Sequence, residues 1–264
     1  MKKQPSPLNK HHFDGRLWVA ADIHLGPHAP DTAAAFYAFL EQAAQETDAL
    51  ILCGDIFEAW IGDDIIQRPP AWLETVIDAL RAFAQTTPLF LMRGNRDFLL
   101  GHQFAAHVHA QCLPDELIIS TPQRDFLLAH GDQFCTDDHA YLRYRRTVHQ
   151  RWLQRLFLCL PLSLRERIAH SLRQQSKQRN YATLGDIYEP DTATTLIAHG
   201  QTLLIHGHTH QPAIHHFGDQ PALSRVVIPD WEYDHSQPVR GGWVSIDLDG
   251  SVGLHRHGYP TRYL

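Results

Sequence analysis

Five short apolar runs along the chain each end directly in a group of polar residues. The runs span residues 17–21, 49–53, 89–92, 126–129 and 203–205, and the groups after them combine Gly with Asp, Asn or His, or join Asp to His. Short runs that are apolar throughout indicate strands buried on both faces. The pattern therefore predicts an α/β fold with a sheet covered by helices on both sides.

Helical patterns separate the first of these strands. An Ala-rich stretch covers residues 32–46, with Asp31 placed to cap its N-terminus, and a second helix is expected over residues 71–84. In α/β layers of this kind, ligands bind beyond the carboxyl ends of the strands. We therefore expect the five polar groups to converge at one edge of the sheet.

The polar groups supply seven candidate metal ligands, and none of them is a glutamate or a cysteine. Mixed nitrogen and oxygen ligands suit Mn, Fe, Co or Zn. Seven ligands are too many for one tetrahedral ion, but they can serve two ions about 3.5–4 Å apart that share one carboxylate. Asp55 is the natural bridge, because its strand should be central. The candidate ligands are Asp22, His24, Asp55, Asn95, His130, His208 and His210.

A pair of such ions activates water and neutralises charge on a phosphoryl oxygen. This chemistry predicts a hydrolase that acts on phosphate esters or anhydrides.

The strand pattern is interrupted between Asp138 and Asp191. This segment has apolar residues at helical spacing, many arginines, and Pro161 between two of the expected helices. Two interpretations remain open for the helices. They form either a hairpin packed on the core with solvated arginines, or a cap over the metal site that meets an anionic, apolar partner or membrane surface. We expect a tail without regular structure over residues 1–15, one domain over residues 16–264, and the helical insertion at about residues 139–190.

The C-terminal part of the chain is less informative. Residues 225–228 and 242–248 are expected to form strands of a second sheet. Asp230 and Trp231 either line the site or pack in the core, and we favour packing for both.

Composition narrows the choice of partners. The formal net charge is -6, which argues against a nucleic-acid partner.

The four cysteines lack the C-x-x-C spacing of a zinc or redox site, and each is expected to be a buried thiol. The N-terminus lacks the apolar segment of a signal peptide, and no run is long enough for a membrane span. These features predict a cytoplasmic protein with no obligate protein partner.

Five motifs occur in a fixed order: Asp-x-His at 22–24, Gly-Asp at 54–55, Gly-Asn-x-Asp at 94–97, His-Gly-Asp at 130–132 and Gly-His-Thr-His at 207–210. In this order they resemble the calcineurin-like metallophosphoesterases. The resemblance implies a two-layer mixed β-sandwich flanked by helices. It assigns metal one to Asp22, His24, Asp55 and His210, and metal two to Asp55, Asn95, His130 and His208.

Arg96 departs from the commoner form of that family, which has a histidine at this position. A histidine can protonate an alkoxide leaving group, whereas an arginine keeps its proton near neutral pH. The substitution favours a leaving group that needs no proton, such as a phosphate monoester expelled from a diphosphate. Arg96 would then hold the diphosphate by paired hydrogen bonds. We therefore predict pyrophosphatase-type cleavage, with a purely structural arginine as the alternative.

A closer resemblance involves the segments 54–64, 94–101, 130–138 and 152–154. These are similar to the UDP-2,3-diacylglucosamine diphosphatases of lipid A biosynthesis, over about residues 17–215. The resemblance implies two Mn²⁺ ions and attack of a metal-activated water on the α-phosphorus of a UDP-linked diacylglucosamine lipid. The products are UMP and 2,3-diacylglucosamine 1-phosphate. It also implies that the helical insertion binds the acyl chains and the anionic cytoplasmic face of the inner membrane.

The same resemblance assigns roles to individual residues. Catalysis is assigned to Asp55, Asn95, Arg96 and His130. The family's substrate contacts correspond to Asn95, Arg96, Asp138, Ser176, Asn180 and His208, and Thr183 stands where the family has a contacting lysine. The alternatives are another metallophosphoesterase, such as a nucleotidase, phosphoprotein phosphatase or nuclease, and a non-catalytic scaffold of the same fold.

Overall fold

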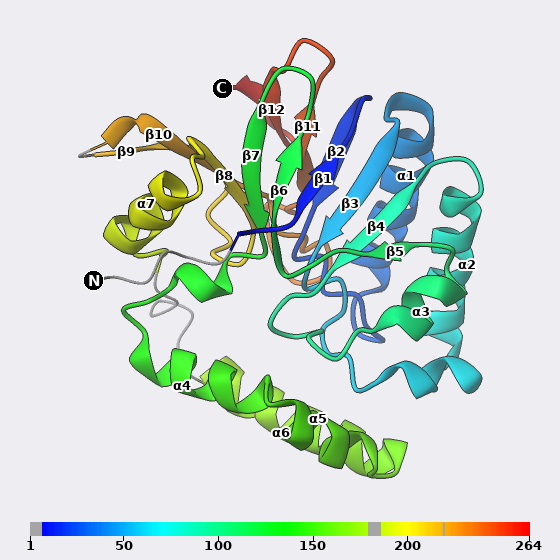
Figure 1. Cartoon of the computed structure of the whole chain (residues 1–264). Coiled ribbons are helices and arrows are strands. Elements are labelled where there is room, and N and C mark those ends of the chain that lie inside the picture. The colour runs from blue at the N-terminus through cyan, green and yellow to red at the C-terminus, as the bar shows by residue number, and fades with distance from the viewer. Residues whose placement is uncertain (1–6, 179–185, 219) are drawn as a thin grey trace.

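The computed structural model, which describes residues 7–178, 186–218 and 220–264, contains two β-sheets packed face to face (Figure 1). The six-stranded sheet has the order β1 (Lys10–His12), β6 (Glu116–Ser120), β7 (Asp125–Ala129), β8 (Leu203–His206), β10 (Gln220–Val227) and β9 (Ile214–Phe217). The seven-stranded sheet has the order β13 (Arg262–Tyr263), β12 (Val252–Arg256), β11 (Gly242–Ile246), β2 (Leu17–Ala20), β3 (Ala49–Cys53), β4 (Leu89–Met92) and β5 (Gln111–Cys112).

Helices cover the outer faces of both sheets. The helices α1 (Pro30–Glu46), α2 (Ala71–Ala84) and α3 (His102–His107) lie against the seven-stranded sheet, and α7 (Glu189–Ala198) lies against the other (Figure 1). Two short 3₁₀ turns, η1 (Asp63–Gln67) and η2 (Asp132–Phe134), complete the loops. The predicted sandwich flanked by helices is confirmed.

The apolar runs are divided between the two sheets, which corrects the expectation of one sheet with helices on both sides. Strands β2, β3 and β4 belong to one sheet, and β7 and β8 belong to the other. Side chains such as Val19, Ile51, Leu128 and Ile205 fill the space between the sheets. Every run is still buried on both faces, because one face meets the other sheet and the opposite face meets helices. Burial alone therefore could not distinguish the two arrangements.

Three local predictions are wrong. Lys10–His12 is a strand, β1, that pairs in parallel with β6, although this segment was assigned to the tail. Asp31 lies in the first turn of α1 and is not its cap; the cap residue is Ala29. The last two expected strands do not share a sheet, since β10 pairs with β8 and β11 pairs with β2.

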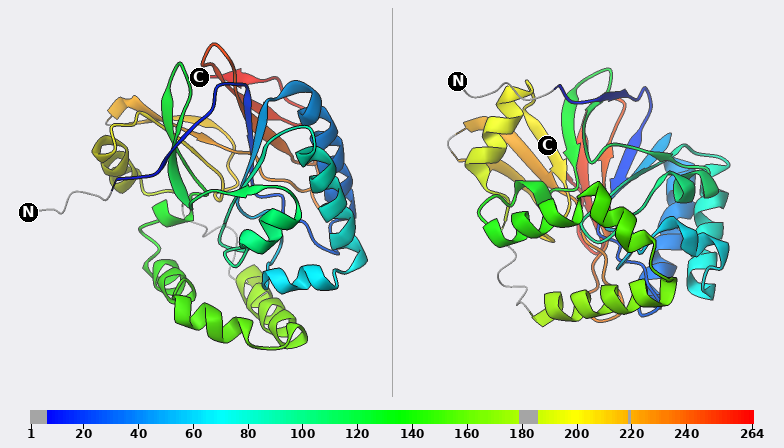
Figure 2. Two further views of the ribbon diagram at one scale, coloured as in Figure 1. Left: turned by 45° about the vertical axis from the view of Figure 1, so that its right-hand side comes forward. Right: turned by 60° about the horizontal axis from the view of Figure 1, so that its bottom comes forward.

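The helices α4 (His139–Val148), α5 (Arg151–Leu158) and α6 (Leu162–Gln178) form a separate layer beyond one edge of the sandwich (Figures 1 and 2). Pro161 separates α5 from α6, as predicted. We call these three helices the helical layer. None of the buried clusters of the two-sheet core includes a residue of this layer, as far as the described residues go. Large apolar side chains on it are instead exposed: Tyr144, Trp152, Leu156, Leu158, Leu164 and Leu172.

One buried arginine attaches the helical layer to the core. Arg165 of α6 is 2 % exposed and donates to the Ile61 carbonyl oxygen at 2.6 Å and to Asp64 Oδ1 at 2.9 Å. Cys159, at the end of α5, is exposed and Cys112 is only partly buried, so the expectation of four buried thiols is wrong at these two positions. The layer has little apolar contact with the core, which explains why a cysteine within it reaches solvent.

Candidate active site

The carboxyl ends of five strands place the seven candidate ligands at one edge of the sandwich. The residues lie within four positions of the ends of β2, β3, β4, β7 and β8, as the sequence predicted. The backbone at Asp22, His24, Asp55, His208 and His210 has φ between 51° and 67°, in the left-handed region. Non-glycine residues seldom adopt this conformation, although Asp and His do so more often than most, and a cluster of such residues is typical of active sites.

Asp22, His24 and His210 form the first cluster. Each offers one ligand atom, and these atoms lie within 4.8 Å of one another. His24 Nε2 is 3.4 Å from His210 Nε2, and His210 Nε2 is 3.5 Å from Asp22 Oδ1. Asp22 Oδ1 is buried and has no hydrogen-bond partner within the described part of the chain. An orphaned carboxylate oxygen facing two imidazole nitrogens fits a cation.

The second cluster contains Asp22, Asp55 and His130, whose ligand atoms also lie within 4.8 Å of one another. His130 Nε2 is 3.6 Å from Asp55 Oδ1. Asn95 Oδ1 joins this cluster, at 3.1 Å from His130 Nε2 and 2.9 Å from His208 Nδ1. The predicted convergence of the polar groups is therefore confirmed. Asp22 is the residue common to both clusters, whereas Asp55 belongs to the second cluster alone, and its bridging role stays a prediction.

Burial and neighbouring charges keep two of the histidines neutral. Burial lowers the pKa of His208 to about 4, with a further contribution from His130. Burial, then Arg96, holds the pKa of His24 well below its usual value. His130 differs: burial alone would lower its pKa, but the carboxylates of Asp55 and Asp22 raise it to about 9. A neutral imidazole is the form that binds a metal, so this environment suits His24 and His208 as ligands.

Asp97 fixes the backbone that carries Asp55 and Asn95, a role that the sequence analysis did not assign. It is fully buried and accepts hydrogen bonds from the backbone N–H groups of Gly94 at 2.6 Å, Ile56 at 2.7 Å and Asp55 at 3.2 Å. Burial, then the Asp55 carboxylate, raises the pKa of Asp97 to about 7. The Gly-Asn-Arg-Asp motif contains the residue, but only the fold reveals what it binds.

Two loops approach each other so closely at position 94 that only glycine fits there. A Cβ at this position would lie 2.2 Å from Asp55 Oδ1 and 2.4 Å from the Asp55 backbone nitrogen. We expect Gly94→Ala to lower kcat/KM by about 10²-fold, since a small displacement of a catalytic group has an effect of this size. Gly218→Ala is the matched control, because a Cβ there meets no described heavy atom within 4 Å. Equal kcat/KM values for the two variants would contradict the close approach.

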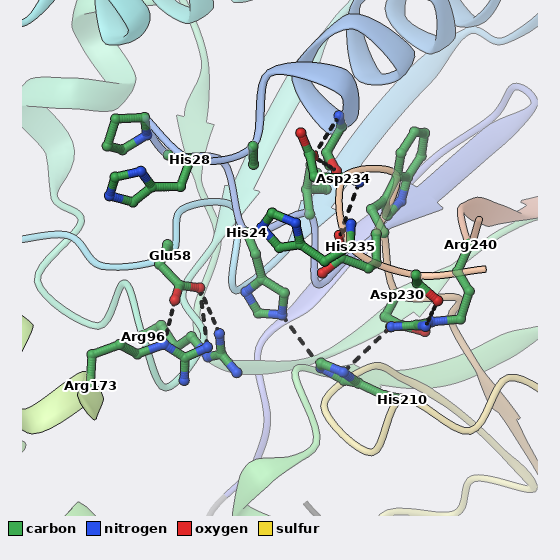
Figure 3. Close-up of a pocket in the computed structure, with 18 of the residues that line it drawn as sticks. His24, His28, Glu58, Arg96, Arg173, His210, Asp230, Asp234, His235 and Arg240 are labelled. Atoms are coloured by element: carbon green, nitrogen blue, oxygen red, sulfur yellow. Dashed lines mark hydrogen bonds and ion pairs between the residues drawn. The ribbon is translucent and has the colours of Figure 1, made fainter. Parts of the chain in front are cut away.

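Arg96 lies beside the candidate metal ligands in a network of charges. Its Nε is 3.4 Å from Asp55 Oδ2, and its Nη1 is 2.8 Å from Glu58 Oε2. Arg173 of α6 also pairs with Glu58, so this acid connects the helical layer to the site (Figure 3). Glu58 could not be identified from the sequence, because nothing in the local pattern indicates that two arginines from distant segments meet there.

A cavity of about 760 Å³ opens beside the first cluster. His24 and His210 line it, and so do the Glu58, Arg96 and Arg173 network and the segment from Asp230 to Arg240 (Figure 3). Asp230 is therefore a site residue, and the preference for packing was wrong for it. Its Oδ2 is 3.5 Å from His210 Nδ1 and 2.9 Å from Arg240 Nε. Trp231 is buried in the core cluster beside α1, as expected, although it also borders the cavity.

Two of the remaining predicted substrate contacts, Asp138 and Ser176, belong to the helices of the helical layer or their caps. Asp138 caps α4 and accepts a hydrogen bond from the Tyr141 backbone N–H at 2.8 Å. Ser176 lies in α6. Asn180 and Thr183 lie outside the described residues. Tyr141 Oη donates to Asp132 Oδ2 at 2.6 Å, which connects α4 to the His-Gly-Asp loop.

Comparisons with known proteins agree with this geometry. The family model of the calcineurin-like phosphoesterases matches residues 15–212. A protein of Bordetella parapertussis named UDP-2,3-diacylglucosamine hydrolase is 43% identical over 247 residues, covering 92% of this chain and 96% of the relative. A protein of the same name from Haemophilus influenzae is 40% identical over 241 residues, covering 90% and 97%.

A solved structure supports the fold. A dimetal phosphatase from Danio rerio aligns over 98% of this chain and 99% of its own, with a TM-score of 0.54 and 11% identity. At this identity the likeness extends to the fold alone. The match to the family model and the two relatives show that the chain belongs to the calcineurin-like phosphoesterases and, among these, to the family of the UDP-2,3-diacylglucosamine hydrolases.

Proposed function

We propose that this protein hydrolyses the diphosphate bond of UDP-2,3-diacylglucosamine and releases UMP and 2,3-diacylglucosamine 1-phosphate for lipid A biosynthesis. One observation carries the proposal: seven potential ligands and Arg96 meet at one edge of the fold in a chain 43% identical to a hydrolase of that name. A bond forms between a water oxygen and the α-phosphorus, and the bond from this phosphorus to the bridging oxygen breaks. The sugar phosphate leaves with the electron pair.

The ligands divide between two Mn²⁺ ions in our proposal. Asp22, His24, Asp55 and His210 would hold one ion, and Asp55, Asn95, His130 and His208 would hold the other. Two bound ions lower the pKa of a water molecule and neutralise charge on the phosphoryl oxygens. The protein contributes oriented ligands, since left-handed backbone at five of them and the hydrogen bonds of Asp97 fix their directions.

Arg96 would stabilise the diphosphate. Its side chain is mostly buried, with 13% exposed, and its Nε lies 3.4 Å from Asp55, the proposed bridge. A guanidinium held in this position presents fixed N–H groups to phosphate oxygens as charge develops on them. The departing sugar phosphate is stable as an anion and needs no proton from Arg96.

The helical layer would bind the lipid half of the substrate. Its exposed apolar side chains give the acyl chains a surface, and its arginines favour phosphate and anionic lipid. Asp138, Ser176 and Asn180 would contact the substrate, and Thr183 would replace a lysine of the family. No helix among the described residues is long and apolar enough to cross a bilayer. We propose peripheral contact with the cytoplasmic face of the inner membrane.

Substrate preference tests the proposed function. We expect the purified protein with Mn²⁺ to hydrolyse UDP-2,3-diacylglucosamine far faster than p-nitrophenyl phosphate, because the simple ester lacks the diphosphate that Arg96 would hold and the acyl chains that the helical layer would bind. The measurement is kcat/KM for both compounds under the same conditions. Preference for the simple ester would point to a phosphomonoesterase, and absence of activity on either compound would point to a scaffold.

Hydrolysis in ¹⁸O-labelled water identifies the attacked phosphorus. Attack on the α-phosphorus places the label in UMP, whereas attack on the β-phosphorus places it in the sugar phosphate. We expect the label in UMP by mass spectrometry of the separated products. Label in the sugar phosphate would overturn the assignment of the leaving group.

A further inference from the structure

The residues that line the cavity beside the first cluster differ in type from the exposed residues of the helical layer. Most of its lining residues are polar or charged; the lining includes His28, Gln211, Asp234, His235 and Arg240. None of the exposed apolar side chains of the helical layer named above lines it, and the layer contributes the ion-paired Arg173 to the lining. Its volume of about 760 Å³ falls within the range of about 300–1,000 Å³ typical of small-molecule sites.

We infer that this cavity binds the nucleotide half of the substrate, with the uridine between His28 and the segment from Asp230 to Arg240. The inference rests on the proposed function. A substrate cleaved at its diphosphate has a polar half and an acylated half, and both must extend from the metal ligands. The apolar surface of the helical layer suits the acylated half. The cavity on the side of His24 and His210 has both polar groups and apolar surface, which suits the nucleotide.

The wall of the cavity offers groups that a nucleoside needs. Asp230 is 2% exposed, and its Oδ1 has no hydrogen-bond partner within the described ranges. A carboxylate oxygen can accept from a ribose hydroxyl or from the N3–H of uracil. The imidazoles of His28 and His235 can stack on a base and donate to its carbonyl oxygens. Figure 3 shows His28 and Arg240 at opposite sides of the space, with His235 between them.

The segment from Asp230 to Arg240 is held in place before any ligand binds. Glu232 and Arg240 exchange two backbone hydrogen bonds, at 2.9 and 3.0 Å. Asp234 supplies the cap that Asp31 does not: its carboxylate accepts from the backbone N–H groups of Asp31 and Thr32, both at 3.0 Å, and from Thr32 Oγ1 at 2.7 Å. A wall fixed in this way loses little conformational entropy on binding, which favours affinity.

Direct binding of UMP to the full-length protein with Mn²⁺ tests the inference. Titration calorimetry would compare UMP with ribose 5-phosphate and inorganic phosphate for the wild type, the double variant His28→Ala/His235→Ala, and the control His12→Ala. His12 lies on β1 and does not line the cavity. We expect the wild type and the control to bind UMP more tightly than ribose 5-phosphate. The double variant should lose about tenfold or more in UMP affinity, the scale of one base–aromatic contact.

The outcomes separate the inference from the proposed function. Unchanged UMP affinity in the double variant, or equal affinity of the wild type for UMP and ribose 5-phosphate, would overturn the base-binding cavity. Either result would leave the proposed hydrolysis of UDP-2,3-diacylglucosamine uncontradicted. Conversely, selective UMP binding without hydrolysis of the lipid would leave the cavity assigned and refute the proposed substrate. A folded double variant, checked by its thermal unfolding, excludes loss of structure as the cause of weaker binding.

Discussion

Replacing Asp55 by alanine is expected to abolish hydrolysis of UDP-2,3-diacylglucosamine. Asp55 is 1% exposed, lies 3.6 Å from His130 and belongs to the second cluster of ligand atoms. As the proposed bridge it would serve both ions, so its loss affects the whole centre. We expect kcat to fall by about 10³-fold or more, the scale seen when a preorganised electrostatic group is removed. Steady-state kinetics with saturating Mn²⁺ measures the change.

Asp55→Asn separates loss of charge from loss of shape. The asparagine keeps an oxygen that can accept from the Arg96 backbone N–H, which now donates to Asp55 Oδ1 at 2.8 Å. It also removes a buried negative charge next to Asp97. We therefore expect Asp55→Asn to be inactive, folded and depleted of Mn²⁺ in metal analysis. Asp125→Ala, which removes an exposed partner of Lys10, is the control and should match the wild type. Activity of Asp55→Ala within a few-fold of wild type would refute the shared carboxylate.

The second large effect is expected at Arg96. We predict that Arg96→Ala lowers kcat/KM, and that the loss corresponds to a rise of about 2–4 kcal/mol in activation free energy, as for other preorganised charges. Arg96→Lys should recover little, because a lysine cannot reproduce the planar fork that binds two phosphate oxygens. The measurement is kcat/KM for the UDP-linked lipid.

A variant of a neighbouring arginine controls for the loss of positive charge. Arg240→Ala removes an arginine that also lines the cavity but lies beside Asp230, away from Asp55. It should weaken binding of UMP more than it lowers kcat. If Arg96→Ala and Arg96→Lys both retained wild-type kcat/KM, the structural interpretation of Arg96 would stand and the diphosphate clamp would be rejected.

Much of the site could be predicted from the sequence, because its residues come soon after apolar strands. The strand ends at Asp22, Asp55 and His130 are local features, and the order of the motifs connects them to a known family. A buried strand leaves few positions for a polar residue, so the side chain that follows it is easily identified. This explains why the seven candidate ligands could be named before the fold was known.

The residues that support the candidate ligands could not be predicted in the same way. Asp97 binds the backbone of the loop after β3, Glu58 joins arginines from two segments, and Asp230 meets His210 from the loop after β10. These contacts depend on how the loops fold over one another, which no spacing rule encodes. The tail strand β1 was missed for a similar reason, because Lys10–His12 is polar and pairs with β6 through its backbone.

The left-handed backbone at Asp22, His24, Asp55, His208 and His210 has a consequence for engineering. Unfavourable φ values of this kind cost about 1–3 kcal/mol each, whereas glycine adopts them freely. A screen that selects only for heat resistance would therefore favour glycine at these positions and lose the ligands. Thermostable variants of this enzyme should be sought in its surface loops and helices, with the five positions held constant.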